Sequence, residues 1–163
     1  MKPLATFAMI VLLGTSAAVS AATPEAQLMA PIRLFVDSFN KGDLHAAAAA
    51  LSPAGLAIID DVSPHVWVGP NALEAWSKAL DASDQAQGNT GGAVTLGKPT
   101  RLVISADRGY VVVPAVYTFS TKSVPMREPG QIVCALQNGT SGWQLTGWTW
   151  VGTKPKPVAG AAK

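Results

Sequence analysis

The sequence is poor in cysteine, histidine and charge, and each shortage excludes a class of protein. Its 163 residues include one cysteine and two histidines, and only 13% of them are charged. A single thiol cannot form an internal disulfide framework, and one cysteine with two histidines cannot complete the usual structural zinc sets. The net charge of +2 is too small for the basic patch that binds nucleic acid. We therefore expect no metal, no other cofactor and no nucleic-acid partner. Cys134 lies in the strand-like run QIVCALQ, where a free cysteine behaves as a small buried apolar residue.

Apolar residues are concentrated at the start of the chain. A lysine and an apolar run over residues 4–13 precede the small residues of AVSAATP. This order is typical of a secretory signal peptide, with cleavage after Ala21 or Ala22. A membrane anchor would need about 20 continuous apolar residues, and polar residues interrupt this run from Thr15 onward. We expect residues 1–21 to be removed and the mature protein to be secreted or periplasmic, without stable membrane insertion.

Helix signals come first in the remaining chain, and strand signals follow. Thr23-Pro24 opens a helix, which continues with apolar residues at helical spacing from Ile32 to Phe39. An alanine-rich helix follows at 44–51, and Gly69-Pro70-Asn71 opens a third. The strand-like runs are GLAIID, HVWVG, AVTLGKPTRLVIS, GYVVVPAVYTFS, GQIVCALQ and GWQLTGWTWVG.

This order of elements predicts one α+β domain at residues 22–152. A curved, mostly antiparallel sheet would pack on about three helices, leaving a cavity between the layers. Residues 153–163, rich in lysine, proline and alanine, are predicted to form a disordered tail.

The connections between the runs make further predictions. SDQAQGNTGG is rich in polar residues and glycine, which predicts a loop. TKSVPMREP is expected to connect two strands, and Asn138-Gly139 is typical of a hairpin turn. Pro114 lies inside the longest run, which predicts a bulge or a bend at that point.

Three stretches of this chain carry a resemblance to a known family: FVDSFNKGDLHAAAAALSPAGLAIID, VGPNALEAW and NGTSGWQLTGWTWVG. In this order they resemble the nuclear transport factor 2-like superfamily, in its SnoaL-like and ketosteroid-isomerase-like branches. The resemblance implies a cone-shaped sheet over roughly residues 30–151. It places Asp60 where the isomerases carry their catalytic aspartate. The isomerases' tyrosine and protonated acid correspond to Phe35 and about Val133, which lack that chemistry, so a standard ketosteroid isomerase mechanism is not expected.

Asp60 and His65 are the candidate catalytic residues. An apolar setting would raise the pKa of a buried aspartate and make it a credible base. Successive strand residues point to opposite faces, so we expect one of Asp60 and Asp61 to face the cavity. The alternatives are an aspartate that faces solvent or caps the next turn, and a histidine on a surface loop. The candidate ligand-binding residues are aromatic: Phe35, Phe39, Trp67, Trp76, Tyr117 and Trp148.

Strict alternation in GWQLTGWTWVG would put Trp148 and Trp150 on one face, and Trp143, Leu145 and Val151 on the other. Bulk on both faces indicates a strand covered on both sides, and the resemblance implies that a second copy covers the outer face of the sheet.

The leading hypothesis is an exported small domain that binds an apolar or amphipathic molecule in a cone-shaped cavity. The first alternative is a cofactor-free SnoaL-like lyase, isomerase or cyclase with Asp60 as general base. The second is a structural or interaction module that pairs through its sheet.

Overall fold

The computed structural model describes residues 22–159, so the predicted signal peptide at residues 1–21 lies outside the described residues. No helix within this described part is long and apolar enough to span a membrane. The elements in chain order are α1 (Pro24–Asn40), α2 (Leu44–Ala48), β1 (Leu56–Ile59), β2 (Val66–Gly69), α3 (Ala72–Gln87), β3 (Asn89–Leu96), β4 (Arg101–Ser105), β5 (Arg108–Thr121), β6 (Val124–Gly139), β7 (Gly142–Gly152) and β8 (Lys156–Pro157).

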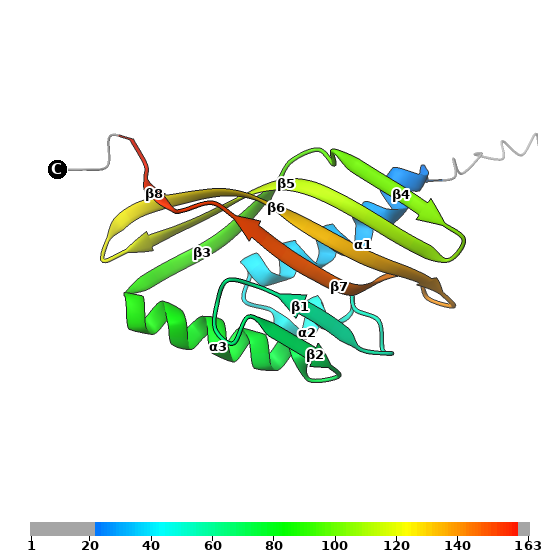
Figure 1. Cartoon of the computed structure of the whole chain (residues 1–163), viewed down its shortest axis with the longest axis horizontal. Coiled ribbons are helices and arrows are strands. Elements are labelled where there is room, and N and C mark those ends of the chain that lie inside the picture. The colour runs from blue at the N-terminus through cyan, green and yellow to red at the C-terminus, as the bar shows by residue number, and fades with distance from the viewer. Residues whose placement is uncertain (1–21, 160–163) are drawn as a thin grey trace, which may run out of the picture.

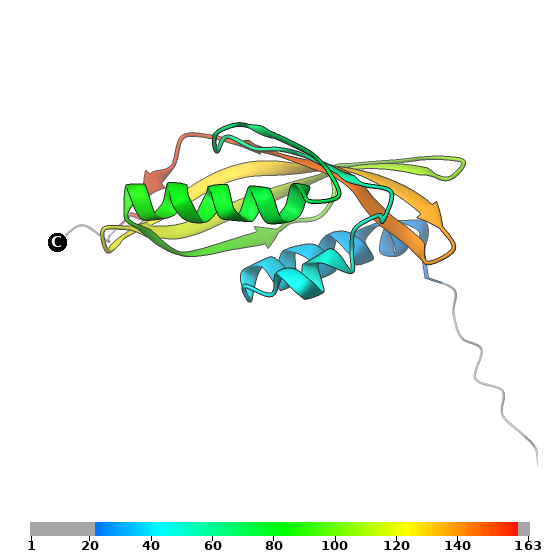
Figure 2. The same ribbon diagram turned by 90° about the horizontal axis from the view of Figure 1, so that it is seen from below.

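The strands form one eight-stranded sheet with three helices on it, so the predicted α+β fold is confirmed. The strand order is β2-β1-β7-β6-β5-β3, with β4 paired to β5 and β8 paired to β6. All pairs are antiparallel except β1 with β7. Figure 1 shows the long strands twisting across the molecule, with α1 behind them and α3 below β1. Figure 2 shows α3 toward one end of the sheet and α1 toward the other.

The core lies between α1 and the inner face of the sheet. Thr23 caps α1 by accepting a hydrogen bond from the Ala26 amide, and Pro24 occupies its first turn. The apolar stripe of α1 is buried, as predicted, with Ile32 0% and Phe35 4% exposed. Burying such side chains stabilises the fold by about 1.5–3 kcal/mol each. Cys134 is fully buried, and burial raises the pKa of its thiol to about 12, in agreement with a structural role.

The predicted connection at TKSVPMREP is wrong, because most of it is strand. Lys122 and Ser123 both have positive φ, at 49° and 69°, which suits the two-residue turn of a tight hairpin. β6 therefore starts at Val124 and pairs with the whole length of β5. This pairing places Glu128 directly opposite Tyr117.

Of the bulge or bend predicted at Pro114, the bulge does not form. The ladder between β5 and β6 runs through Pro114 without a register shift. On the other side of β5, the β3 ladder begins at Ala115 and the β4 ladder ends at Val112. Pro114 thus lies in the gap between two partner strands, where its missing N–H removes no ladder bond.

A bulge occurs in β7 instead. Ala135 pairs with Gly147 and Leu136 with Leu145, which leaves Thr146 unpaired. The extra residue brings Leu145 and Trp148 to the same inner face, where they are 1% and 6% exposed. Trp143 packs against the same core, so the prediction that Trp143 and Leu145 lie opposite Trp148 is wrong. Val151 does face outward, 52% exposed.

Two segments that were expected to lack regular secondary structure contain helix or strand residues. Helix α3 extends to Gln87, Gly88 ends it with a left-handed φ of 73°, and β3 starts at Asn89, so SDQAQGNTGG is not a loop. The tail predicted to be disordered from residue 153 contains β8, which pairs with Met126 and Arg127 of β6. Residues 160–163 of the tail lie outside the described part.

Candidate functional site

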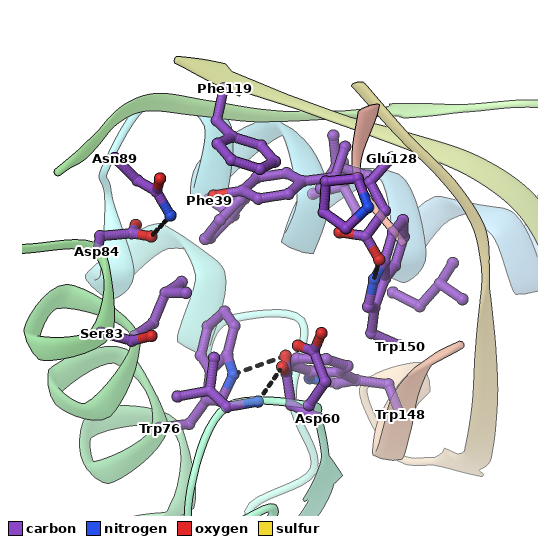
Figure 3. A pocket seen from close by; sticks show the side chains of 18 of the residues that line it. Phe39, Asp60, Trp76, Ser83, Asp84, Asn89, Phe119, Glu128, Trp148 and Trp150 are labelled. Carbon is purple, nitrogen blue, oxygen red and sulfur yellow. Dashed lines mark hydrogen bonds between the residues drawn. The ribbon is translucent and has the colours of Figure 1, made fainter. Parts of the chain in front are cut away.

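A cavity of about 150 Å³ lies between the helices and the inner face of the sheet (Figure 3). Helices α1 and α3, the segment after β1 and strands β3, β5, β6 and β7 all contribute to it. Its apolar lining is Phe35, Val36, Phe39, Val62, Trp76, Leu80, Val94, Tyr117, Phe119, Ile132, Trp148, Trp150 and Pro155. Its polar lining is Asp60, Asp61, Ser83, Asp84, Gln87, Asn89 and Glu128.

The structure brings six of the eight predicted site residues to this cavity: Phe35, Phe39, Asp60, Trp76, Tyr117 and Trp148. The remaining two do not line it. Trp67 is buried in the core at 7% exposure. His65 is exposed, and its ring Nδ1 lies 3.3 Å from the backbone oxygen of Asp60. His65 therefore helps to close the turn after β1 and does not reach the cavity.

The Asp60 carboxylate is held in place by two donors. Its Oδ1 accepts a hydrogen bond from the Val62 amide at 3.1 Å, and its Oδ2 accepts one from Trp76 Nε1 at 3.0 Å (Figure 3). Burial and the neighbouring Asp61 raise the pKa of Asp60 to about 6, although both donors act in the opposite direction. Near neutral pH this carboxyl group can therefore both accept and return a proton.

Asp61 also lines the cavity, so the expectation that one aspartate faces inward is wrong. Strand β1 ends at Ile59. The backbone then turns, and the amide of Asp60 donates to the His65 carbonyl at 3.1 Å. Alternation applies within a strand, and both carboxylates lie beyond the end of this one.

A second buried acid faces the cavity from the sheet. Glu128 is 5% exposed and accepts a hydrogen bond from Trp150 Nε1 at 3.0 Å. Burial raises its pKa, and the bond from Trp150 lowers it in part. Opposite it, burial and nearby carboxylates raise the pKa of Tyr117. The Tyr117 phenol thus stays protonated and available as a hydrogen-bond donor.

Sequence reasoning missed Glu128, Trp150 and Asp84 as site residues. Glu128 was assigned to a connection, although it lies on the same face of β6 as Ile132, which lines the cavity. Val133, the position to which the resemblance assigned an acid, is not among the lining residues. The sequence signal that could have indicated such side chains is glycine, since a glycine inside a strand marks a place where another group lies close to the backbone.

Two glycines make room for the polar side chains. A Cβ at Gly152 would overlap the Glu128 carboxylate and the Trp150 indole. A Cβ at Gly92 would overlap the Tyr117 hydroxyl. These cavity side chains lie against bare backbone, so the sheet itself fixes their positions.

The end of α1 is fixed to the cavity wall by Asn40. Its Nδ2 donates to the Val94 carbonyl at 2.8 Å, and its Oδ1 accepts from the Val94 amide at 2.8 Å. Since Val94 lines the cavity, this paired bond connects the helix to strand β3 beside the site. Among the described residues, no group of three or more His, Cys, Asp and Glu side chains is placed to hold a metal ion.

The helices and the inner face of the sheet thus enclose an aromatic cavity that contains a half-buried aspartate. No family model and no curated protein sequence matches the chain. Solved structures do match it. A ketosteroid isomerase-like protein from Erwinia carotovora atroseptica is 20% identical with a TM-score of 0.61, and the match covers 80% of this chain and 97% of that one.

Two other similar structures are a dehydrochlorinase and a kinase hub. Hexachlorocyclohexane dehydrochlorinase LinA-type3 from Novosphingobium barchaimii has a TM-score of 0.68 at 10% identity, covering 83% of this chain and 90% of that one. The CaMKII hub of S. rosetta has a TM-score of 0.65 at 15% identity, covering 82% and 100%. The chain therefore has the nuclear transport factor 2-like fold, as its sequence resemblance implied.

Proposed function

We propose that the protein binds a small apolar or amphipathic organic molecule in this cavity. The observation that carries the proposal is that seven aromatic side chains surround about 150 Å³ of unfilled space. Protein interiors normally leave few voids larger than a water molecule, and an apolar cavity of about 150 Å³ accommodates a benzene-sized ring. Similar folds include a ketosteroid isomerase-like protein and a dehydrochlorinase, which supports a cavity that receives small organic molecules.

A filled-cavity variant tests this proposal. Ser83 on α3 lines the cavity, and its neighbour Ala82 is exposed. Benzyl alcohol, phenol or cyclohexanone should raise the melting temperature, since ligand at a hundredfold excess over Kd stabilises by about 2.7 kcal/mol. Ser83→Phe should abolish this response, whereas Ala82→Phe should keep it. The proposal fails if no small organic ligand stabilises the wild-type protein, or if both variants respond equally.

We also propose a second function, proton transfer by Asp60 at a carbon next to a carbonyl. The specific observation is a positioned carboxylate whose pKa is raised to about 6. The carboxylate would take the α-proton, leaving an enolate whose oxygen accepts a hydrogen bond from a donor such as Tyr117. The Asp60 carboxylic acid would exchange its proton with solvent and then return a proton to carbon, which in heavy water is a deuteron.

Solvent deuterium reports this step without knowledge of the natural substrate. In heavy water, the protein should catalyse exchange of the α-protons of cyclohexanone, followed by proton NMR. Asp60→Asn should slow the exchange by about a hundredfold or more. The exposed Asp81 on the same protein offers a matched control, and Asp81→Asn should leave the rate unchanged. Equal rates in the wild-type protein and Asp60→Asn would exclude the mechanism.

We further propose that the protein is exported and forms a homodimer through the outer face of its sheet. The outward side chains Ile59, Val66, Val68 and Val151 are 52%, 53%, 76% and 52% exposed on the neighbouring strands β1, β2 and β7. Export with cleavage after Ala21 or Ala22 stays a prediction, which N-terminal sequencing of the processed protein checks.

A further inference from the structure

The cavity concentrates acidic side chains and has no basic one. Four of the ten Asp and Glu residues of the chain line it: Asp60, Asp61, Asp84 and Glu128. Within residues 22–159, no lysine, arginine or histidine does. The chain as a whole has a net charge of +2, so the acidity belongs to this cavity and not to the general composition.

Seven of the residues that line the cavity are aromatic. Trp76 and Trp148 meet edge to face with ring centroids 4.9 Å apart, and Tyr117 and Phe119 stack at 5.0 Å. These rings come from α3, β7 and β5, so they surround the space from several sides (Figure 3). Ring faces attract cations, and sites for quaternary ammonium groups are aromatic cages of this kind. Carboxylates among the rings add a direct charge attraction.

Trp148 supplies an independent sign of a missing ligand. Its side chain is 6% exposed, and its Nε1 has no hydrogen-bond partner among the described residues. Figure 3 shows the Trp148 ring pointing into the cavity beside Asp60. A buried N–H group normally has an acceptor. Trp76 and Trp150 both donate to cavity carboxylates, which leaves Trp148 as the unused donor.

We propose that the cavity binds a small organic cation that also carries an oxygen acceptor, such as a quaternary ammonium alcohol. This inference rests on the proposed binding function and names the ligand class for the same cavity. The cation lies against the aromatic rings and the carboxylates, and the oxygen of the ligand accepts the Trp148 N–H. A space of about 150 Å³ restricts the ligand to roughly the size of a single six-membered ring.

Binding of a cation should depend on pH. The titratable groups facing the cavity are Asp60 and Asp61 after β1, Asp84 on α3, Tyr117 on β5 and Glu128 on β6. The pKa of Asp60 is raised to about 6 and that of Glu128 is also raised. A cation favours the ionised carboxylates, so it displaces protons when it binds, and affinity should increase as pH rises from 5 to 8.

The test compares two ligands of the same shape. Choline and 3,3-dimethylbutan-1-ol differ in the charge of one central atom and share a hydroxyl group, and choline keeps its charge at every pH used. By calorimetry at pH 8, choline should bind at least tenfold more tightly. Glu128→Gln should reduce that ratio, while the exposed control Asp81→Asn should preserve it. Tetramethylammonium, which lacks the hydroxyl group, should bind more weakly than choline, and Trp148→Phe should remove this difference.

The outcomes separate this inference from the proposal on which it rests. If the neutral alcohol binds as tightly as choline, the cavity still binds small molecules, and the inferred charge of the ligand is wrong. The inferred charge is also wrong if neither of the two binds while benzyl alcohol or phenol stabilises the protein. If none of these ligands binds, both the cation inference and the binding function are wrong.

Discussion

At the scale of single residues, Asp60 is held in an environment that opposes its usual charge. Burial and the adjacent Asp61 raise its pKa from 3.8 to about 6. The folded protein thus binds a proton at this position more tightly than the unfolded chain does. Stability must therefore fall as pH rises from about 4 to about 6, where the unfolded chain has already released the proton. Above that range, the effect of Asp60 on the free energy of unfolding no longer changes with pH.

The pH dependence of unfolding tests this argument. Between pH 4 and pH 7, Asp60 should cost the wild-type protein about 1–2 kcal/mol of unfolding free energy, a value reduced for its partial exposure. Asp60→Asn cannot titrate at this position. The free energy of unfolding, measured with urea at pH 4, 5, 6 and 7, should therefore fall by this amount in the wild-type protein relative to Asp60→Asn. Asp81→Asn should run parallel to the wild-type curve. If Asp60→Asn also runs parallel to it, the pKa of Asp60 is not raised.

At the scale of elements, the sequence correctly predicted the helices and strands whose start, periodicity and end are all marked within one segment. Thr23-Pro24 and the apolar stripe defined α1, and GWQLTGWTWVG matches β7 from Gly142 to Gly152. These signals lie within one element, so one segment of sequence contains them all. The cap, the spacing and the flanking glycines each point to the same structure.

The predicted strand GQIVCALQ begins only at Gly130, whereas β6 begins at Val124 and includes Pro125 and Pro129. Strand β7 ends at Gly152, opposite Gly130 of β6. Before Gly130, therefore, β6 has β5 as its long partner, and its ladder on the other side is limited to the two residue pairs with β8. Prolines are tolerated where one side of a strand is barely paired. This pairing is set by distant segments, which no local pattern describes.

The position of the turn between β6 and β7 also depends on distant contacts that the local sequence does not show. Asn138-Gly139 is a strong turn signal, yet both residues are paired, with Trp143 and Gly142. Leu136 and Leu145 pair in the core, 1% exposed each. Burial of that pair fixes the register, so the turn falls at Thr140 and Ser141. Long-range packing here overrides a local preference.

The site residues that were predicted and those that were missed also differ in whether they depend on local sequence or on strand pairing. Asp60 and the aromatic residues followed from the resemblance and from their residue type. Glu128 enters the cavity only through the register that sets it opposite Tyr117, and its carboxylate fits only because residue 152 is glycine. Both conditions concern pairs of strands, and neither is visible in one segment.

At the scale of the whole molecule, the two faces of the sheet differ in what covers them. Helices cover the inner face, and the described residues leave an apolar strip on the outer face. The adjacent strands β2, β1 and β7 contain no charged residue. Depletion of charge is typical of the centre of a protein interface. Strand β2 is also an edge, and natural edges usually carry charge or proline to prevent association.

A second copy of the chain is the occupant that we expect on this strip, because it would cover the valines of both protomers at once. Val68 lies on the outer face, 76% exposed, whereas Val124 begins β6 at the distant hairpin, 39% exposed. Val68→Lys should convert the dimer to a monomer in sedimentation equilibrium and make the unfolding temperature independent of protein concentration. Val124→Lys should remain dimeric. A wild-type protein that sediments as a monomer up to its solubility limit would exclude this interface, and the exposed valines would then have to meet a different partner.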